Sequence, residues 1–166
     1  MAPTLSIRPS DRGDIPAVDA LLARAYPKLL KADYPPSVLV TAVPLIARAR
    51  PELIASGTYY VAEDDHGAIV GAGGWSVLRG RTGRTLAEVR HFVTDPDRVR
   101  QGIGRGIMEQ VIASCRAAGA RELACQSTLT AVPFYRALGF VGIGRIDVPL
   151  AECVFFPAVR MLLRLG

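Results

Sequence analysis

Cysteine is scarce in this sequence, with Cys115, Cys125 and Cys153 the three among 166 residues. They are odd in number, far apart and set among apolar residues, a pattern typical of reduced packing thiols rather than disulfides. Their spacing matches none of the cysteine and histidine patterns that bind zinc. We therefore expect neither a disulfide framework nor a metal site.

Long apolar runs are lacking too. Pro, Arg or Lys interrupts the apolar stretches well short of the roughly 20 residues that a membrane span needs. The opening residues, MAPTLSIRPSDRGD, do not contain the apolar core of a signal peptide. The sequence thus predicts a cytoplasmic protein without a membrane partner.

The composition is that of a folded domain. Half of the residues are hydrophobic and 21% are charged, which in a chain of 166 residues predicts a single domain over residues 1–166. The net charge of +5 points to an anionic ligand or partner. The basic residues are mostly scattered arginines, with no basic helix and no platform of basic and aromatic residues, so we do not expect nucleic acid as the partner.

Hydrophobic periodicity predicts an alternation of strands and helices. A strand at 4–10 precedes a helix that Asp14 caps and whose apolar face contains Ile15, Val18, Leu21, Leu22 and Ala25. Residues 27–56 are apolar but repeatedly broken by proline, which predicts short helices or a loop lying over a site. Residues 58–78 form two strands around a turn at 65–67, and a third strand follows at 86–94.

The second half continues in the same way. A helix with an apolar stripe at Ile103, Ile107, Met108, Val111, Ile112 and Cys115 ends near Gly119. A strand at 122–128, a short helix at 130–139 and a strand pair at 140–150 and 153–165 complete the chain. The order predicts an α/β (α+β) fold with a mixed, mostly antiparallel sheet of about six to seven strands flanked by about four helices.

A glycine-rich loop, VRQGIGRGIMEQV at 99–111, opens the second long helix. It is not a Walker loop, because no Gly-Lys-Ser/Thr follows, and Ile107 stands where the dinucleotide fingerprint needs its third glycine. Without either fingerprint, the loop still has the general features of a phosphate site. Its glycines allow the backbone to approach an anion closely, and the free N–H groups at a helix start bind phosphate. A simple glycine-rich turn is the alternative reading of the loop taken alone.

A second motif, TAVPFYRALGF at 130–140, follows about thirty residues later. Together with VTDPDRVRQGIGRGIM at 93–108 it closely resembles the GNAT superfamily of acyl-CoA-dependent N-acetyltransferases. In that family a strand with Val-x-Pro leads into an Arg/Gln-x-x-Gly-x-Gly/Ala loop, and a later helix carries Ala-x-x-Phe-Tyr-x-x-Leu-Gly-Phe. The segments VTDP, VRQGIG and AVPFYRALGF stand here in that order, with Val99 where the family often has Arg or Gln.

The resemblance implies acetyl-CoA as co-substrate and a set of residues that bind it. A strand that splays from its neighbour exposes a backbone edge to the pantetheine arm, with a backbone N–H near Val93 facing the thioester carbonyl. Ser127 and Thr128 either hydrogen-bond the coenzyme or cap the next helix, for which Thr130 is the better candidate. The residues implied at the acetyl end are Phe92, Val93 and Thr94, and those at the pyrophosphate are Arg100, Gln101, Gly102, Ile103, Gly104, Arg105 and Gly106, with the side chain of Arg98 as a further contact.

Two residues carry the expected chemistry. Tyr135 matches the family tyrosine whose hydroxyl reaches the coenzyme sulfur as general acid, and packing beside Phe134 is the alternative. Glu88 lies on the strand before the loop, where several family members place a base carboxylate; a solvated pair with Arg90 is the alternative. His91 and ordered water are the rival bases, although strand alternation places His91 with Ala87, Val89 and Val93 in the core unless a bulge intervenes.

The function we expect is direct transfer of an acetyl group from acetyl-CoA to an amine in a ternary complex. A small-molecule amine is favoured over a protein because the segment 27–56 can close over a compact site, where Tyr34 is placed for substrate contact. The alternative is a non-catalytic module of the same fold that binds or senses acyl-CoA. The sequence leaves the oligomeric state open, with a homodimer as one outcome.

Overall fold

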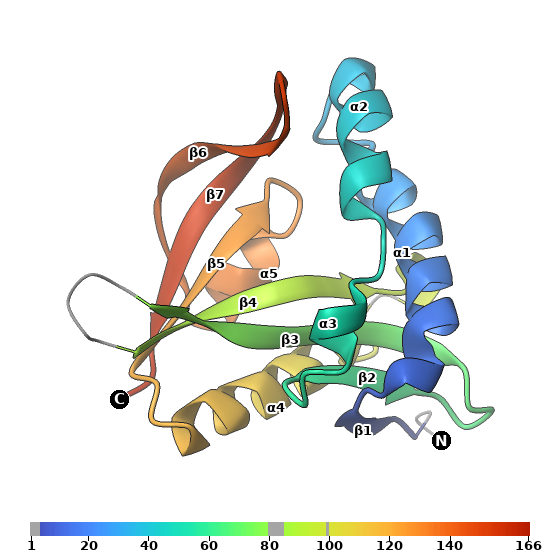
Figure 1. Cartoon of the computed structure of the whole chain (residues 1–166), viewed down its shortest axis with the longest axis vertical. Helices are drawn as coiled ribbons and strands as arrows, with labels where there is room; N and C mark the ends of the chain where they lie inside the picture. The colour runs from blue at the N-terminus through green and yellow to red at the C-terminus, as the bar shows by residue number, and fades with distance from the viewer. Residues whose placement is uncertain (1–3, 80–84, 99) are drawn as a thin grey trace.

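The computed structural model describes residues 4–79, 85–98 and 100–166, and seven strands in them form one sheet in the order β1-β2-β3-β4-β5-β7-β6 (Figure 1). The strands are β1 (Ser6–Pro9), β2 (Tyr59–Glu63), β3 (Ile69–Arg79), β4 (Thr85–Thr94), β5 (Glu122–Thr128), β6 (Val141–Ala151) and β7 (Val154–Arg164). The helices are α1 (Ile15–Leu30), α2 (Pro36–Ile46), α3 (Pro51–Ile54), α4 (Ile103–Ala117) and α5 (Val132–Ala137). Val99, in the glycine-rich loop, lies outside the described residues.

The sheet is mixed, as the sequence predicts. β4 and β5 are parallel because α4 carries the chain across between them, and every other neighbouring pair is antiparallel. The parallel contact is short: it pairs only Leu86, Ala87 and Glu88 with Glu122, Leu123 and Ala124. Beyond these residues β4 stays with β3 and β5 stays with β7, so the two central strands diverge.

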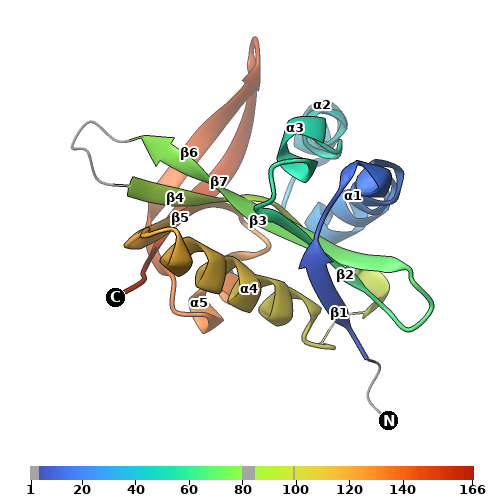
Figure 2. The ribbon, with the colours of Figure 1, turned by 60° about the horizontal axis from the view of Figure 1, so that its bottom comes forward.

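Helices cover both faces of the sheet, with α4 and α5 on one face and α1, α2 and α3 on the other (Figures 1 and 2). Each layer has its own core of buried residues. The predicted stripe of α4 is confirmed, since Ile103, Ile107, Met108, Val111 and Cys115 are buried and Ile112 is partly buried. Burial of such a stripe against a sheet is the main source of stability for an amphipathic helix.

The proline-broken segment is helical, but its first break comes later than expected. α1 continues through Pro27 to Leu30. Tyr26 and Leu30 are buried against the sheet, and the free energy gained by burying them outweighs the loss of one backbone hydrogen bond at Pro27. α2 and α3 are the short helices that the pattern predicts, and each starts with a proline in its first turn.

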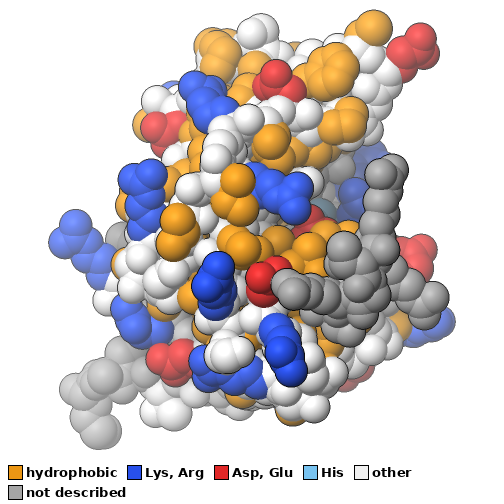
Figure 3. All heavy atoms as spheres, turned by 90° about the vertical axis from the view of Figure 1, so that its left-hand side faces the viewer, with side chains coloured by type: hydrophobic (Ala, Val, Ile, Leu, Met, Phe, Trp, Pro, Cys, Tyr) orange, Lys and Arg blue, Asp and Glu red, His pale blue; other side chains and the backbone are white. Residues whose placement is uncertain are grey.

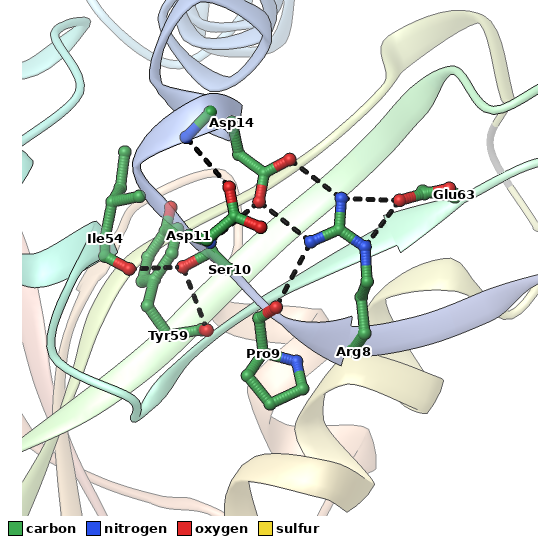
Figure 4. Close-up of polar contacts among 9 residues, drawn as sticks. Arg8, Pro9, Ser10, Asp11, Asp14, Ile54, Tyr59 and Glu63 are labelled. Atoms are coloured by element: carbon green, nitrogen blue, oxygen red, sulfur yellow. Dashed lines mark hydrogen bonds and ion pairs between the residues drawn. The ribbon is translucent and has the colours of Figure 1, made fainter.

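The start of α1 is fixed by an ion-pair cluster rather than by the predicted cap (Figure 4). Asp14 occupies the N-cap position of α1 but makes no capping bond to that helix, so that prediction is wrong. Its carboxylate instead accepts the Asp11 N–H at 2.8 Å, in a capping box of the 3-10 turn Arg12–Asp14 that precedes α1. Its carboxylate accepts two hydrogen bonds of 2.8 Å from the Arg8 guanidinium, which also pairs with Glu63. Nearby, the Ser10 hydroxyl donates to the carbonyls of Ile54 and Tyr59. β1, α1, α3 and the first residue of β2 are thereby joined at one point.

Candidate active site

A cavity of about 790 Å³ opens where β4 and β5 diverge. One wall consists of β4 from Glu88 to Thr94, and the other of Cys125, Gln126 and Thr128 of β5. The start of α4 and the helix α5 close one end. Because Val89–Thr94 have no strand partner on the β5 side, the backbone edge of β4 faces this space.

A bulge in β4 sets the shape of the cavity wall. Arg90 pairs with Gly74 and Val93 with Ala72, so Gly73 alone lies opposite His91 and Phe92. His91 has a φ of 47°, in the left-handed region. A Cβ on Gly73 would lie 2.3 Å from the Phe92 ring, so only glycine fits there.

The bulge invalidates the strand alternation by which His91 was assigned to the core. Val89 and Phe92 pack on the α4 side of the sheet, whereas Val93 packs on the α1 side. Val89 and Val93 therefore do not share a face, and His91 is only half buried and lines the cavity. The prediction of a packing role for His91 is wrong for this reason.

Two tyrosines of the α1 layer hold the carbonyls of the bulge. The Tyr59 hydroxyl donates to the His91 carbonyl at 2.7 Å, and the Tyr26 hydroxyl donates to the Phe92 carbonyl at 3.3 Å. Burial raises the pKa of both hydroxyls, so both remain donors. Because C=O and N–H of a trans peptide point in opposite directions, these bonds also direct the N–H groups of Phe92 and Val93 away from the tyrosines.

The glycine-rich loop presents the start of α4 to the cavity. Gly102 is the N-cap with a φ of 77°, and no side chain caps the helix. The Gly106 N–H donates to the Gly102 carbonyl, while the N–H groups of the first helical residues have no partner within the helix. Ile103, Gly104 and Arg105 line the cavity, so these donors and the positive end of the helix face it. A Cβ on Gly104 would lie 2.9 Å from the Phe134 ring, which explains the close approach of α4 and α5.

Most residues predicted to bind the coenzyme line this one cavity: Phe92, Val93, Thr94, Arg100, Gln101, Gly102, Ile103, Gly104, Arg105, Thr128 and Tyr135. Gly106 and Ser127 are not among its lining residues. Gly106 faces Ile7 of β1, and Ser127 is 1% exposed with its hydroxyl donating to the Thr128 carbonyl at 2.7 Å. Arg98 borders the cavity, yet its guanidinium pairs with Asp64 at 2.7 Å.

The turn before α5 is held by Thr128 and not by Thr130. The Thr128 hydroxyl accepts the Ala131 N–H at 3.1 Å, whereas the Thr130 hydroxyl donates to Asp33 at 2.7 Å. The prediction of Thr130 as the cap is therefore wrong, because the α1 layer supplies it with a carboxylate that the local sequence does not reveal.

Tyr135 combines a buried ring with a hydroxyl that opens to the cavity. The residue is 5% exposed and its ring contacts Phe92, Phe134 and Phe140. In the described part of the chain the Tyr135 hydroxyl forms no hydrogen bond. Every fully enclosed side-chain polar atom in that part has a partner, so this hydroxyl is open to the cavity that Tyr135 lines. Burial raises the pKa of Tyr135 well above 10, so the hydroxyl is protonated at neutral pH.

Glu88 and His91 both line the cavity. No ion pair joins Glu88 to Arg90 within the described ranges, and Arg90 instead donates to the Ser76 hydroxyl at 3.1 Å. Burial lowers the pKa of His91 from 6.5 to about 4, and the charges of Arg50 and Arg90 add to the effect. His91 is therefore neutral at physiological pH.

Several lining residues are not found by sequence reasoning. Arg50, Gln126 and Tyr26 border the cavity, together with an apolar wall of Leu29, Leu30, Ile46, Val148, Leu150 and Phe156. Tyr34, predicted to contact substrate, does not line it: its hydroxyl donates to the Pro157 carbonyl at 2.6 Å and accepts the Leu129 N–H at 2.8 Å. Its ring stacks on Phe156, so Tyr34 joins the turn between α1 and α2 to β7.

On the face shown in Figure 3, Lys and Arg side chains lie singly among hydrophobic ones.

Over residues 4–79, 85–98 and 100–166, no helix has both the length and the apolar content of a membrane span. In the same ranges, no three His, Cys, Asp or Glu side chains gather as metal ligands do.

Comparison with known proteins agrees with this geometry. The family described as acetyltransferase (GNAT) domain matches residues 55–142. No curated protein sequence matches at a level that marks a relative.

Solved structures with the same fold cover nearly the whole chain. A GCN5-related N-acetyltransferase from Rhodopseudomonas palustris has a TM-score of 0.75 and 19% identity, over 99% of this chain and 98% of that one. PaiA N-acetyltransferase from Thermoplasma acidophilum, in complex with coenzyme A, has a TM-score of 0.74 and 12% identity over 97% and 99%. A phosphinothricin acetyltransferase from Sinorhizobium meliloti, in complex with acetyl-CoA, has a TM-score of 0.66 and 21% identity over 100% and 90%.

Proposed function

The chain belongs to the GNAT family of acetyltransferases, and we propose that it transfers an acetyl group from acetyl-CoA directly to an amine in a ternary complex. The observation that carries the proposal is a single cavity with three features. It contains the unpaired edge of β4, the uncapped start of α4 and the free hydroxyl of Tyr135. In acetyl-CoA, the diphosphate needs N–H donors such as those of the helix start, the pantetheine amides need a backbone edge, and the departing sulfur needs a proton donor.

We place the coenzyme along this cavity, with its diphosphate at the start of α4 and its acetyl group at the bulge of β4. Its diphosphate accepts hydrogen bonds from the N–H groups of Ile103, Gly104 and Arg105, and the side chains of Arg100 and Arg105 add charge-assisted bonds. Its pantetheine amides bond to the exposed backbone edge of β4, and the acetyl group lies at Phe92, Val93 and Thr94. Gly106 and Ser127 are left out of this set because neither reaches the cavity.

The reaction needs no covalent intermediate on the protein. The neutral amine attacks the thioester carbonyl carbon, the C–N bond forms and the C–S bond breaks. The protonated Tyr135 hydroxyl supplies a proton to the departing sulfur, and the nitrogen loses a proton to Glu88 through water. The Phe92 N–H, in the peptide whose carbonyl Tyr59 holds, stabilises the negative charge on the carbonyl oxygen. The products are an N-acetylated amine and the free thiol of coenzyme A.

Turnover of acetyl-CoA against a panel of amines tests this function. The panel contains amino acids, aliphatic amines, polyamines and short peptides, and release of the coenzyme thiol is the signal. We expect release that depends on one class of amine and an acetylated product in equal amount. Binding of acetyl-CoA without amine-dependent release across the panel would contradict the enzyme and indicate the alternative, a module that binds acyl-CoA without catalysis.

A further inference from the structure

The cavity has a second basic region that the diphosphate does not use. Among the described residues, five arginines line it, Arg50, Arg90, Arg98, Arg100 and Arg105, against one carboxylate, Glu88. Arg98, Arg100 and Arg105 lie at or just before the start of α4, where the diphosphate would bind. Arg50 directly precedes α3, and Arg90 lies on β4 before the bulge, next to His91. These two cations therefore belong to the part of the cavity beyond the acetyl end.

Neither Arg50 nor Arg90 has a carboxylate partner among the described residues. The ion pairs in those ranges involve Arg8, Arg24, Lys28 and Arg98. Arg90 donates one hydrogen bond, to the Ser76 hydroxyl at 3.1 Å, and leaves its remaining guanidinium donors for other acceptors. Arg50, Arg90 and His91 all line the cavity, and the charges of both arginines add to the effect of burial in lowering the pKa of His91.

The cavity also has an apolar wall. Leu29 and Leu30 of α1, Ile46 of α2, Val148 and Leu150 of β6 and Phe156 of β7 contribute to its lining. In Figure 1, α2 stands beside the tip formed by β6 and β7. An occupant of the cavity therefore has hydrocarbon side chains and two cations within its lining.

We propose that the amine acceptor is an amino acid with an apolar side chain, and that Arg50 and Arg90 bind its carboxylate. This inference rests on the proposed acetyl transfer. A guanidinium presents a planar pair of donors that matches a carboxylate, and hydrogen bonds between charged groups are the stronger ones. The apolar wall receives the side chain of the amino acid. A polyamine would instead bring several positive charges against Arg50 and Arg90, which disfavours that class.

Matched substrate pairs test the proposal. L-leucine is compared with 3-methylbutylamine and L-phenylalanine with 2-phenylethylamine, since each pair shares its side chain and differs by the carboxylate. Because the carboxylate also lowers the pKa of the amine, kcat/KM is calculated for the concentration of neutral amine. We expect kcat/KM to be at least about 10-fold higher for each amino acid than for its amine, and spermidine to be the poorest substrate.

Variants then identify the residues. Arg50→Gln and Arg90→Gln should each lower kcat/KM about 10- to 100-fold for the amino acid, mainly through KM, and leave the matched amine and the KM for acetyl-CoA unchanged. Arg48→Gln removes an equal charge two residues from Arg50, outside the lining of the cavity, and should change none of these values. Should Arg90→Gln fold poorly, Arg90→Lys keeps the charge and loses the paired donors, and it should show the same selective loss.

Two results separate the possible failures. If amines are acetylated but the carboxylate brings no advantage, or if the variants affect amino acid and amine equally, the proposed subsite is wrong while acetyl transfer stands. If no amine in any pair supports thiol release from bound acetyl-CoA, the proposed function itself is wrong and the subsite falls with it.

Discussion

The Tyr135 hydroxyl is the one part of that residue that packing does not explain. Tyr135→Phe keeps the ring and its contacts with Phe92, Phe134 and Phe140, so the free energy of unfolding should change little. If the hydroxyl protonates the departing sulfur, kcat should fall about 100-fold with a smaller effect on the affinity for the coenzyme. The measurement is kcat with the best acceptor, beside the melting temperature. Equal turnover in two equally stable proteins would remove Tyr135 from the mechanism.

Glu88 is tested through the pH dependence of the rate. Glu88→Gln keeps the size of the side chain and removes the base, so kcat/KM should fall most on the acidic side of the profile while coenzyme binding persists. A profile whose shape does not change would indicate that His91 or water, and not Glu88, accepts the proton of the amine.

His91→Asn distinguishes those two, and asparagine tolerates the positive φ at this position. Because the pKa of His91 is lowered to about 4, its imidazole is neutral above that pH and gains a proton only below it. A His91 base would therefore give a loss of rate as the pH falls through about 4, and this loss would vanish in the variant.

Among the secondary-structure elements, the bulge of β4 depends on Tyr26 of α1 and Tyr59 of β2, whose hydroxyls hold its carbonyls. Tyr59→Phe removes the donor to the His91 carbonyl and should lower kcat about 10-fold or more, because small displacements of reacting groups are costly. The matched control is Tyr34→Phe, which also removes a buried hydroxyl bonded to backbone groups but lies outside the cavity lining. Each variant should lose about 1–3 kcal/mol of stability. The same kcat in both variants would show that holding the bulge carbonyl does not matter to the reaction.

The order of the elements could be read from the sequence because local signals determine it. The stripe of α4, the turn at 65–67 and the glycine after α5 each act within a few residues of chain, and the predicted helices and strands appear in the expected order. The residues that would bind the coenzyme came instead from the resemblance of two motifs to the GNAT superfamily, and most of them line one cavity.

What the sequence could not show depends on contacts between distant segments. The bulge depends on Gly73, which leaves room for the Phe92 ring, and on two tyrosines that hold its carbonyls. Tyr59 and Tyr26 lie 32 and 66 residues from the carbonyls they hold, too far for any periodicity to reveal. Asp14 and Thr130 do not form the predicted capping bonds, because Asp14 accepts from Arg8 and Thr130 donates to Asp33. Tyr34 is bound to the Pro157 carbonyl of β7, far along the chain, and so does not line the cavity, whereas Arg50 lines it without any signal in the local sequence.

At the scale of the whole molecule, the divergence of β4 and β5 divides the sheet and leaves space for a ligand that contacts both helical layers. Such a ligand should stabilise the folded protein by mass action. At a coenzyme A concentration 100 times Kd the gain is about 2.7 kcal/mol, which predicts a rise in melting temperature of about 5–10 °C for a chain of this size. Pantetheine, which lacks the diphosphate, is the control and should give a much smaller rise. An unchanged melting temperature with millimolar coenzyme A would contradict the assignment of the cavity.

The central claim is direct acetyl transfer between two molecules bound in this one cavity. Initial rates measured over a grid of acetyl-CoA and amine concentrations, with the acetylated amine quantified as product, test it most directly. The account predicts one acetylated amine for each thiol released and double-reciprocal plots that intersect, because both substrates must be bound before transfer. Parallel plots, which indicate an acetylated enzyme intermediate, or thiol release without an acetylated amine, would contradict it.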